Sequence, residues 1–379
     1  MKIIHSHSEK QNQPDYILLI NFVALIVLGL IILSSASYFM ACQEQGDCYF
    51  YLKHQLLRGI LPGLFFFFLF YFFDYKKLKK VALFCLPLTI IFLVSVFIPG
   101  LGFAKGEARR WINLGFLFQP AELAKLAFII YLSAWLTKHQ ANIKSFKEVF
   151  WPFLFFLVII SGLIISQPDL GTLIVFVVIS VAMYFIAGIS FYQLGILFFS
   201  FLVAITAMIK MAPYRLNRMI TFLHPESDPW GIGYHVNQAI MAVSSGGWFG
   251  RGLGYSARKI YYLPEVVSDS IFAVLAEELG FILTAAVVVL YLFLTYRIFR
   301  LALLNKDMFA RLLSAGLGFL FIFQAMVNMG AMLGILPLTG IPLPLIGYGG
   351  TNFVIFCAAF GILANISKQT TIEEKVKKK

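Results

Sequence analysis

The sequence predicts an all-α, polytopic integral membrane protein with about ten transmembrane helices and one large extracytoplasmic loop. Three observations predict this class. Hydrophobic residues make up 60% of the 379 residues, charged residues only 13%, and the mean hydropathy is +0.86. An ordinary soluble domain is about one quarter charged, so that class is excluded. Apolar runs long enough to cross a bilayer recur along the whole chain, which we therefore treat as one membrane domain, residues 1–379.

Ten apolar runs are separated by polar or basic connectors. The expected spans are residues 16–40, 52–73, 81–99, 119–137, 150–166, 173–187, 191–209, 269–296, 312–334 and 351–366. Residues 1–15 precede the first span, and residues 210–268 form the large loop between the seventh and eighth spans. Residues 367–379 form a lysine-rich tail.

The distribution of basic residues predicts the orientation. An even number of spans places both termini on one side, together with the basic connectors 74–80, 138–147 and 297–311. By the positive-inside rule that side is cytoplasmic, so the large loop lies outside. We expect no cleaved signal peptide, since the first apolar run is long enough to span. Cys42 and Cys48 flank a short outer loop, where an oxidising compartment would allow a disulfide.

Several basic residues lie on the outer side, against this rule. They are Arg109, Arg110, Lys210, Arg215, Arg218, Arg251, Arg258 and Lys259. Two interpretations stay open. The cations bind an anionic ligand such as a phosphate, or their long side chains reach the lipid headgroups.

The stretch 261–280 joins the large loop to the eighth span. We expect Ser268 to cap the helix and Asp269 to lie in its first turn, where the helix dipole favours negative charge. At about 100° per residue, Asp269, Ala273, Ala276 and Gly280 share one face, which predicts a groove beneath a carboxylate. Glu277 and Glu278 follow in the same apolar helix, where such groups usually face a bundle interior or a wet cavity. The alternative is that Asp269 is only a helix-start charge.

Other polar residues fall at the ends of apolar runs. Glu122 and Lys125, spaced i, i+3, predict an ion pair that is either structural or functional. Asp169, in the turn 167–172, caps the sixth span or lines a cavity. Residues 234–243, which include Gln238, read as a short interfacial helix. The glycine-rich run 245–254 imitates a nucleotide motif only loosely, and no strand precedes it, so we reject a nucleotide fold.

Known hydrolase and nucleotide-binding motifs are absent from the sequence: it contains no HExxH, P-loop or GxSxG. The candidate catalyst is therefore a carboxylate acting as general base, with or without a divalent cation.

Together these stretches resemble the SEDS family (shape, elongation, division and sporulation) of bacterial peptidoglycan polymerases. The resemblance covers nearly the whole chain. It rests on residues 109–113 (RRWIN), 119–122 (QPAE), 167–172 (QPDLGT), 228–229, 231–234 (GIGY), 263–265 (LPE), 269–280 and 336–350. The runs 34–37 (SSAS) and 252–259 (GLGYSARK) favour the division branch, FtsW, over the elongation branch, RodA, and sporulation members share the pattern.

The resemblance implies a SEDS fold and a glycosyltransferase that polymerises lipid II, a disaccharide-peptide on undecaprenyl pyrophosphate. It makes Asp269 the essential carboxylate, which we interpret as the general base. The candidate substrate-binding residues are Arg109, Arg110, Glu122, Lys125, Asp169, Arg215, Arg218, Gln238 and Glu277. The small-residue face below Asp269 would receive a lipid or its sugar. Mg²⁺ or Mn²⁺ would help to neutralise the pyrophosphate, with Asp269 as candidate ligand, and no organic cofactor is expected.

The implied partners are lipid II, a class B penicillin-binding protein transpeptidase, other division proteins and membrane lipids, and not nucleic acid. The implied location is the bacterial inner membrane at the division septum. The chain departs from the family at residues 267–270, where Val-Ser-Asp-Ser replaces the usual His-Thr-Asp-Phe. Two rival functions stay open: a flippase for lipid II, and a scaffold that only recruits division proteins.

Overall fold

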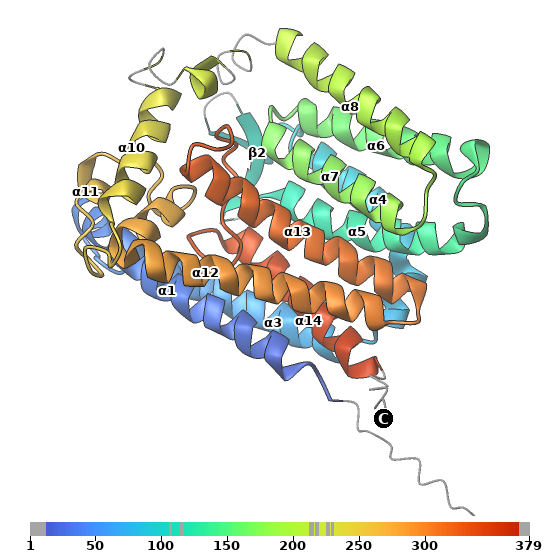
Figure 1. Ribbon diagram of the computed structural model, residues 1–379, viewed down its shortest axis with the longest axis horizontal. Coiled ribbons are helices and arrows are strands. Elements are labelled where there is room, and N and C mark those ends of the chain that lie inside the picture. The colour runs from blue at the N-terminus through green and yellow to red at the C-terminus, as the bar shows by residue number, and fades with distance from the viewer. Residues whose placement is uncertain are drawn as a thin grey trace, which may run out of the picture.

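The structure is a computed structural model that describes residues 13–105, 108–113, 115, 117–211, 216, 220–224, 228 and 231–370. Its long helices lie side by side along one direction (Figure 1). α10 (Ile232–Ser245), α11 (Arg258–Tyr261) and a small sheet gather at one end of the bundle, which we call the loop end. The C-terminal end of α14 (Gly350–Gln369) lies at the opposite end, the tail end.

In the described part of the chain, a helix occupies each of the ten expected positions. Besides α14 these are α1 (Tyr16–Gln45), α2–η1–α3 (Phe50–Gln55, Leu56–Ile60, Leu61–Phe72), α4 (Tyr75–Ser95), α5 (Pro120–Lys138), η3–α6 (Phe146–Phe150, Trp151–Ile165), α7 (Leu170–Ile186), α8 (Phe191–Met211), α12 (Ile271–Leu304) and α13 (Met308–Met332). A short 3₁₀ turn, η2 (Gln140–Asn142), follows α5.

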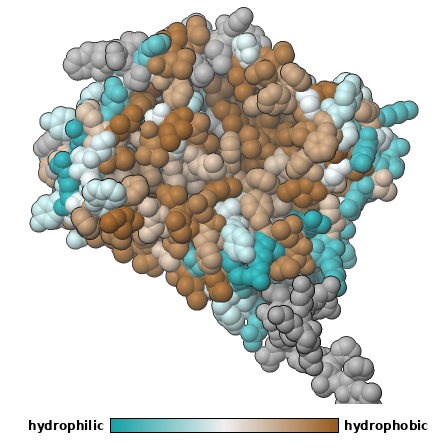
Figure 2. All heavy atoms as spheres, viewed as in Figure 1, coloured by the Kyte–Doolittle hydropathy of each residue, from teal (hydrophilic) through white to brown (hydrophobic). Residues whose placement is uncertain are grey.

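Seven of these helices, in the described residues, are long and apolar enough to cross a membrane. α7 and α8 are shorter apolar helices, and α5 carries Glu122 and Lys125 within its length. The protein is therefore an all-α, multi-pass membrane protein, as predicted. Brown, hydrophobic side chains cover the middle of the face drawn in Figure 2, and hydrophilic ones gather toward its edges.

α13 and α14 form the centre of the bundle. Within their most apolar windows 78% and 89% of residues are buried, against 17–33% for the other five candidate spans. The outer helices expose large apolar side chains, for example Phe65, Phe84 and Phe191. Such side chains suit contact with lipid tails. α5 is also buried along most of its length, so the centre of the protein is these three helices, which the outer ones shield.

Two expected basic connectors are instead helical. Asp74 caps α4 by accepting a hydrogen bond from the Lys76 backbone, so the lysines of 74–80 lie in the first turns of that helix. α12 continues to Leu304, and Arg297 pairs with Asp15 at 2.6 Å. The predicted connector 297–311 is therefore wrong in its extent, because helices continue past the end of their apolar residues.

The loop end holds two features beyond the predicted helices. The connector 100–118 between the third and fourth expected spans contains an antiparallel sheet of β1 (Gly102–Lys105), β2 (Ala108–Asn113) and β3 (Leu117–Phe118). The all-α prediction misses it. Cys42 and Cys48 form a disulfide, so the pairing that the sequence left open is present.

α12 is broken at Gly280, which has φ 73° and ψ −179°. The glycine-rich run beside the break supplies the missing hydrogen bonds. The backbone N–H groups of Arg251 and Gly252 donate to the carbonyls of Glu277 and Glu278, each at 3.0 Å. Beyond the break, Phe281 and Ile282 donate to the carbonyls of Gly247 and Trp248 at 2.8 and 3.2 Å. A run that imitated a nucleotide motif is therefore the cap of an interrupted span.

This packing overturns the predicted groove. Ala273 and Ala276 are buried, and a Cβ built on Gly246 would lie 2.2 Å from the carbonyl oxygen of Ala276. A Cβ built on Gly280 would lie 2.1 Å from the backbone nitrogen of Gly250. The protein's own main chain, and not a lipid or sugar, fills the small-residue face.

Candidate active site

The residues before α12 form a tight turn that sets the place of Asp269. α12 begins at Ile271 with Ser270 as its N-cap residue, so the prediction that Ser268 caps it is wrong. The Ser270 hydroxyl donates to the Pro264 carbonyl at 2.7 Å, and the Ser270 carbonyl accepts from the N–H groups of Ala273 and Val274. Ser268 instead donates to the Glu265 carboxylate at 3.1 Å. Asp269 therefore lies just before the helix and not in its first turn.

Asp269 is half-buried between three parts of the loop end. The Asn328 side-chain amide, on α13, donates to the Asp269 carbonyl at 2.8 Å and to the Ile341 carbonyl at 2.9 Å. A Cβ built on Gly340 would lie 3.4 Å from Oδ2 of Asp269. The carboxylate thus lies against the segment that joins α13 to α14, with its backbone fixed from α13.

That segment, residues 335–349, brings the remaining parts of the candidate site together. The backbone N–H of Tyr348 donates to the Val267 carbonyl at 2.7 Å, close to Asp269 in sequence. A Cβ built on Gly171, at the start of α7, would lie 2.9 Å from the Thr339 carbonyl oxygen. The backbone of Gly349 donates to the Gln55 side chain at 3.1 Å. The segment therefore touches the start of α7, the turn before α12 and the second span.

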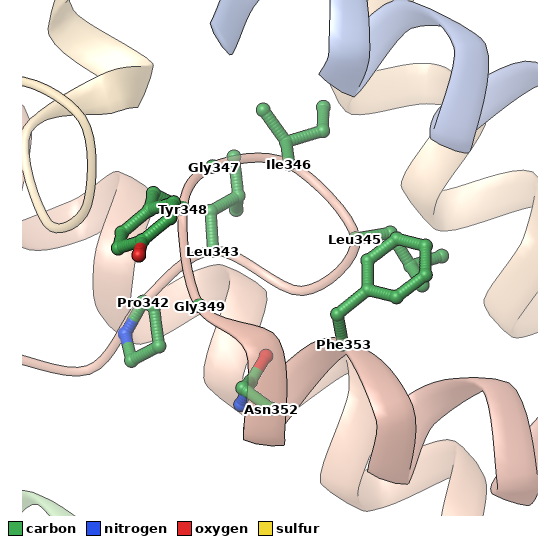
Figure 3. A pocket seen from close by; sticks show the side chains of 9 residues that line it. All are labelled: Pro342, Leu343, Leu345, Ile346, Gly347, Tyr348, Gly349, Asn352 and Phe353. Carbon is green, nitrogen blue, oxygen red and sulfur yellow. The ribbon is translucent and has the colours of Figure 1, made fainter. Parts of the chain in front are cut away.

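A small cleft of about 10 Å³, enough for about one water molecule, lies beside this segment (Figure 3). Its lining is Pro342, Leu343, Leu345, Ile346, Gly347, Tyr348, Gly349, Asn352 and Phe353. Burial raises the pKa of the Tyr348 phenol, and the positive charge of Arg58 opposes that shift. The cleft therefore has an aromatic hydroxyl, an amide and a neighbouring guanidinium at hand.

Glu122 and Lys125 form the predicted ion pair. Lys125 Nζ lies 2.7 Å from Glu122 Oε1, and both side chains are buried. The second carboxylate oxygen, Glu122 Oε2, accepts from the Asn352 amide at 2.8 Å. Because Asn352 also lines the cleft, the pair is connected to it through one side chain.

Asp169 caps α7, one of the two uses that the sequence left open. Its two carboxylate oxygens accept from the backbone N–H and the hydroxyl of Thr172 at 3.1 and 2.8 Å. Arg110 Nη1 lies 3.8 Å from Asp169, and the same guanidinium donates to the carbonyls of Gln167 and Pro168. Arg110 therefore holds the turn of Asp169. Arg109, its neighbour on β2, is exposed.

Gln238 and Glu277 make their contacts within the protein. The Gln238 carbonyl oxygen accepts from Arg258 at 2.5 Å. Glu277, with none of its surface exposed, accepts from Ser256 at 2.5 Å and lies 3.6 Å from Arg251. Of the two surroundings that the sequence left open for Glu277, the protein interior is the one observed, because the glycine-rich run covers it.

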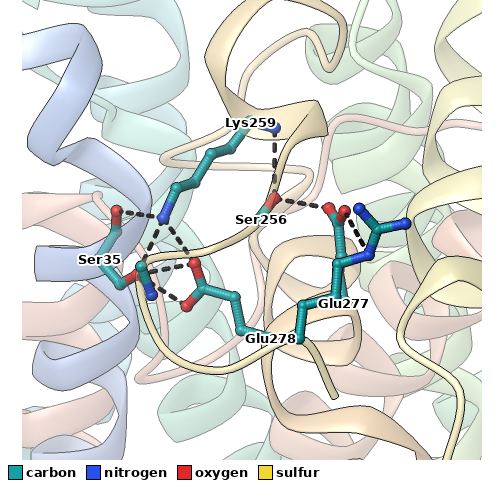
Figure 4. A network of polar contacts seen from close by, with 7 residues as sticks. Ser35, Ser256, Lys259, Glu277 and Glu278 are labelled. Carbon is teal, nitrogen blue, oxygen red and sulfur yellow. Dashed lines mark hydrogen bonds and ion pairs between the residues drawn. The ribbon is translucent and has the colours of Figure 1, made fainter.

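The adjacent Glu278 belongs to a buried network (Figure 4). Its carboxylate accepts from Lys259 Nζ at 2.6 Å and from the Ser35 hydroxyl at 2.7 Å. Lys259 also donates to the Ser35 carbonyl at 3.0 Å. Arg251, Arg258 and Lys259 therefore have a third role beyond the two that the sequence left open, because their described partners are side chains and carbonyl groups of this chain.

Some expected site residues stay predictions. Arg215 and Arg218 lie outside the described residues. In the part of the chain that the structure describes, no three His, Cys, Asp or Glu side chains gather as a metal site would require.

The sequence analysis missed several residues beside Asp269 and the cleft. They are Gln55, Arg58, His235, Asn328 and Asn352. Asn328 had one detectable signal, since a polar side chain in an apolar span marks a residue with a partner. Arg58 had another, as a cation at the outer end of its span.

Comparison with known proteins places the chain among bacterial cell-wall proteins. The sequence profile of the FtsW, RodA and SpoVE family, described as cell cycle protein, matches residues 16–372. Stage V sporulation protein E of Bacillus subtilis is 37% identical over 360 residues, covering 95% of this chain and 98% of that protein. The probable peptidoglycan glycosyltransferase FtsW of Trichlorobacter lovleyi is also 37% identical over 360 residues, covering 93% of each chain.

Two solved structures superpose on nearly the whole chain. RodA of Thermus thermophilus superposes with a TM-score of 0.69 at 26% identity, covering 94% of this chain and 98% of that one. A chain from a peptidoglycan synthase complex that coordinates polymerization and crosslinking superposes with a TM-score of 0.78 at 25% identity, covering 95% and 99%.

Proposed function

Since the chain belongs to the FtsW, RodA and SpoVE family of cell cycle proteins, we propose that it is a peptidoglycan glycosyltransferase that polymerises lipid II. Relatives similar over nearly their whole length carry that activity in their names. Lipid II, as donor and acceptor, is the substrate that the family resemblance implies.

One observation carries the proposal: Asp269 is a half-buried carboxylate at the loop end, set against the segment that also reaches α7 and the cleft. It is neither sealed in the core nor isolated among lipid-facing side chains. A carboxylate within hydrogen-bond reach of the acceptor hydroxyl is a suitable general base.

In the proposed reaction, Asp269 removes the proton from the 4-hydroxyl of the acceptor sugar. The oxygen forms a bond to the anomeric carbon of the donor, with inversion, as the bond from that carbon to the lipid pyrophosphate breaks. The electron pair leaves on the pyrophosphate, and the proton stays on Asp269 until solvent accepts it. Fixing the Asp269 backbone through Asn328 reduces the reorganisation that this transfer needs.

The leaving pyrophosphate needs positive charge. Lys125 and Arg110 are occupied by Glu122 and by the 167–169 turn, so they act by holding Glu122 and that turn in place. We assign the pyrophosphate to Arg109, which is exposed, and to Arg58 beside the cleft, with Arg215 and Arg218 as further candidates from the sequence. Mg²⁺ or Mn²⁺ stays a proposal; the described residues offer no protein-only cage, and no step above depends on a cation.

We further propose the division branch, with a class B penicillin-binding protein as the cross-linking partner and both termini in the cytoplasm of the inner membrane at the septum. The similarity to a chain of a complex that coordinates polymerization and crosslinking supports such a partner. The runs 34–37 and 252–259 support the branch, and they meet in the structure through Ser35 and Lys259.

The test uses purified protein, with and without the transpeptidase, and lipid II that the loop end can reach. Polymer formation by the wild type and its loss in Asp269→Asn, which keeps the side chain's size, supports the proposal. Lipid II movement across vesicles that tolerates Asp269→Asn, with no polymer formed, supports a flippase instead. Normal septation in cells carrying Asp269→Asn would support a scaffold.

A further inference from the structure

His235 reaches the start of α12 from a helix of the large loop. It lies on α10, and its Nε2 is 2.6 Å from the hydroxyl oxygen of Ser270. Ser270 is the N-cap residue of α12 and is fully buried. It follows Asp269 directly, so this contact bears on the residue next to the proposed base.

The direction of these hydrogen bonds is determined by the partners. A carbonyl oxygen only accepts, so the single hydroxyl proton of Ser270 is used in its bond to Pro264. The same oxygen must then accept from His235, and Nε2 carries a proton. The resulting chain runs from His235 through Ser270 to Pro264 and links α10 to the turn that contains Asp269.

α10 is itself held firmly. Its first turn is bound by Asp228, whose carboxylate accepts from the backbone of Gly231 and Ile232 at 3.0 and 2.9 Å. Near its end, a Cβ built on Gly246 would lie 2.2 Å from the Ala276 carbonyl oxygen, so the main chain packs on α12. An imidazole on such a helix can fix the position of what it binds.

We propose that His235 is a positioning residue for Asp269, acting through Ser270. Asn328 holds the Asp269 carbonyl from α13, and His235 holds the following residue from α10, so the base is fixed from two sides. This contact involves a position where the chain departs from the family. Ser270, which stands where the family has phenylalanine, accepts a hydrogen bond from the imidazole of His235, on α10. The inference rests on the proposed function, because it assumes that Asp269 is the base.

The protonation state of His235 gives the proposal a further readout. Burial lowers the pKa of the His235 imidazole, and the negative charge of Glu265 opposes that shift. The neutral ring keeps the proton on Nε2. Acid adds a second proton, at Nδ1, to this partly buried ring.

The experiment compares three variants in the polymerisation assay with lipid II and the transpeptidase. His235→Ala removes the donor, and we expect kcat to fall about 10- to 100-fold with little change in KM, because a small misplacement of a reacting group has that cost. His235→Gln keeps an N–H donor of similar reach and should restore much of the rate. Asn237→Ala, on another face of α10, is the matched control and should behave as the wild type. In His235→Gln the acid limb of the pH profile should also move to lower pH.

Two results would overturn the inference. One is an unchanged kcat in His235→Ala when the wild type is active. The other is a loss that His235→Gln fails to restore. Hydrogen exchange of the backbone amides of residues 264–274 tests the contact between His235 and Ser270 without measuring activity. The exchange rate should rise in His235→Ala and not in Asn237→Ala. Equal exchange in the two variants would also contradict the inference. A wild type that forms no polymer refutes the proposed function, and the exchange result then still shows whether His235 fixes the turn before α12.

Discussion

Replacing Lys259 by methionine should lower stability markedly. Lys259 and Glu278 form an ion pair at 2.6 Å with side chains 3% and 0% exposed. Methionine keeps much of the aliphatic stem and removes the ammonium group, which leaves the Glu278 carboxylate buried with only Ser35 as partner. Removing one member of a buried pair costs about 3–5 kcal/mol, because the remaining charge has no compensation.

The same reasoning predicts that a double replacement recovers much of the loss. Lys259→Met combined with Glu278→Leu removes both charges, and apolar substitutes for buried pairs are often close to neutral. The free energy of unfolding, measured by SDS titration in mixed micelles, should therefore fall far less in the double variant than the two single losses added together.

Lys53→Met provides the matched control. Lys53 and Asp47 lie 2.7 Å apart, almost the same distance, but their side chains are 60% and 40% exposed. Water and salt screen such a pair, so we expect no measurable change. Equal destabilisation by Lys53→Met and Lys259→Met, or strictly additive losses in the double variant, would refute the argument from burial.

Further predictions follow from the same contacts. Gly280→Ala should prevent stable folding, because its φ is 73° and the new Cβ would lie 2.1 Å from Gly250; thermal unfolding of purified protein tests this. Asn328→Leu should lower both kcat and stability, because it removes the amide donor. Asn328→Asp should retain more activity than Asn328→Leu at low pH, where its protonated carboxyl still donates a hydrogen bond. Initial rates of both variants across pH test this prediction. His235 has a lowered pKa, so its neutral form stabilises the fold fully above the ordinary value of 6.5 and the contribution is lost as pH falls through the lowered value. The melting temperature should thus decrease more on acidification in the wild type than in His235→Gln. Excess EDTA should abolish polymer formation if a divalent cation completes the site, and an unchanged rate would remove the cation from the proposal.

Much of the architecture could be predicted because it depends on local pattern. Apolar runs located the ten helices, and the i, i+3 spacing of Glu122 and Lys125 predicted their pair. Capping by Asp169 was one of the two uses that the sequence left open, because a short acidic side chain before a helix can accept from the N–H groups of its first turn. The short helix expected at 234–243 is α10.

What the sequence could not reveal depends on contacts between distant segments. Ser268 and Ser270 offer the same hydroxyl, and only the path of the chain from Pro264 decides that Ser270 stands at the N-cap position of α12. The sequence predicts an open groove over Ala273 and Ala276, whereas in the structure the main chain at Gly246, just after α10, packs on Ala276. Asn328 and Asp269 are 59 residues apart, so no local pattern relates them.

The interruption of α12 at Gly280 has a consequence for how the protein is made. Four main-chain groups beside the break find their described partners in residues 247–252, and leaving each of them buried and unpaired would cost several kcal/mol. Those residues precede α12 in the chain, so they can pair with it only after α12 has been synthesised. An exchange of segments between relatives, in evolution or by design, would therefore have to transfer residues 247–252 and the interrupted span together.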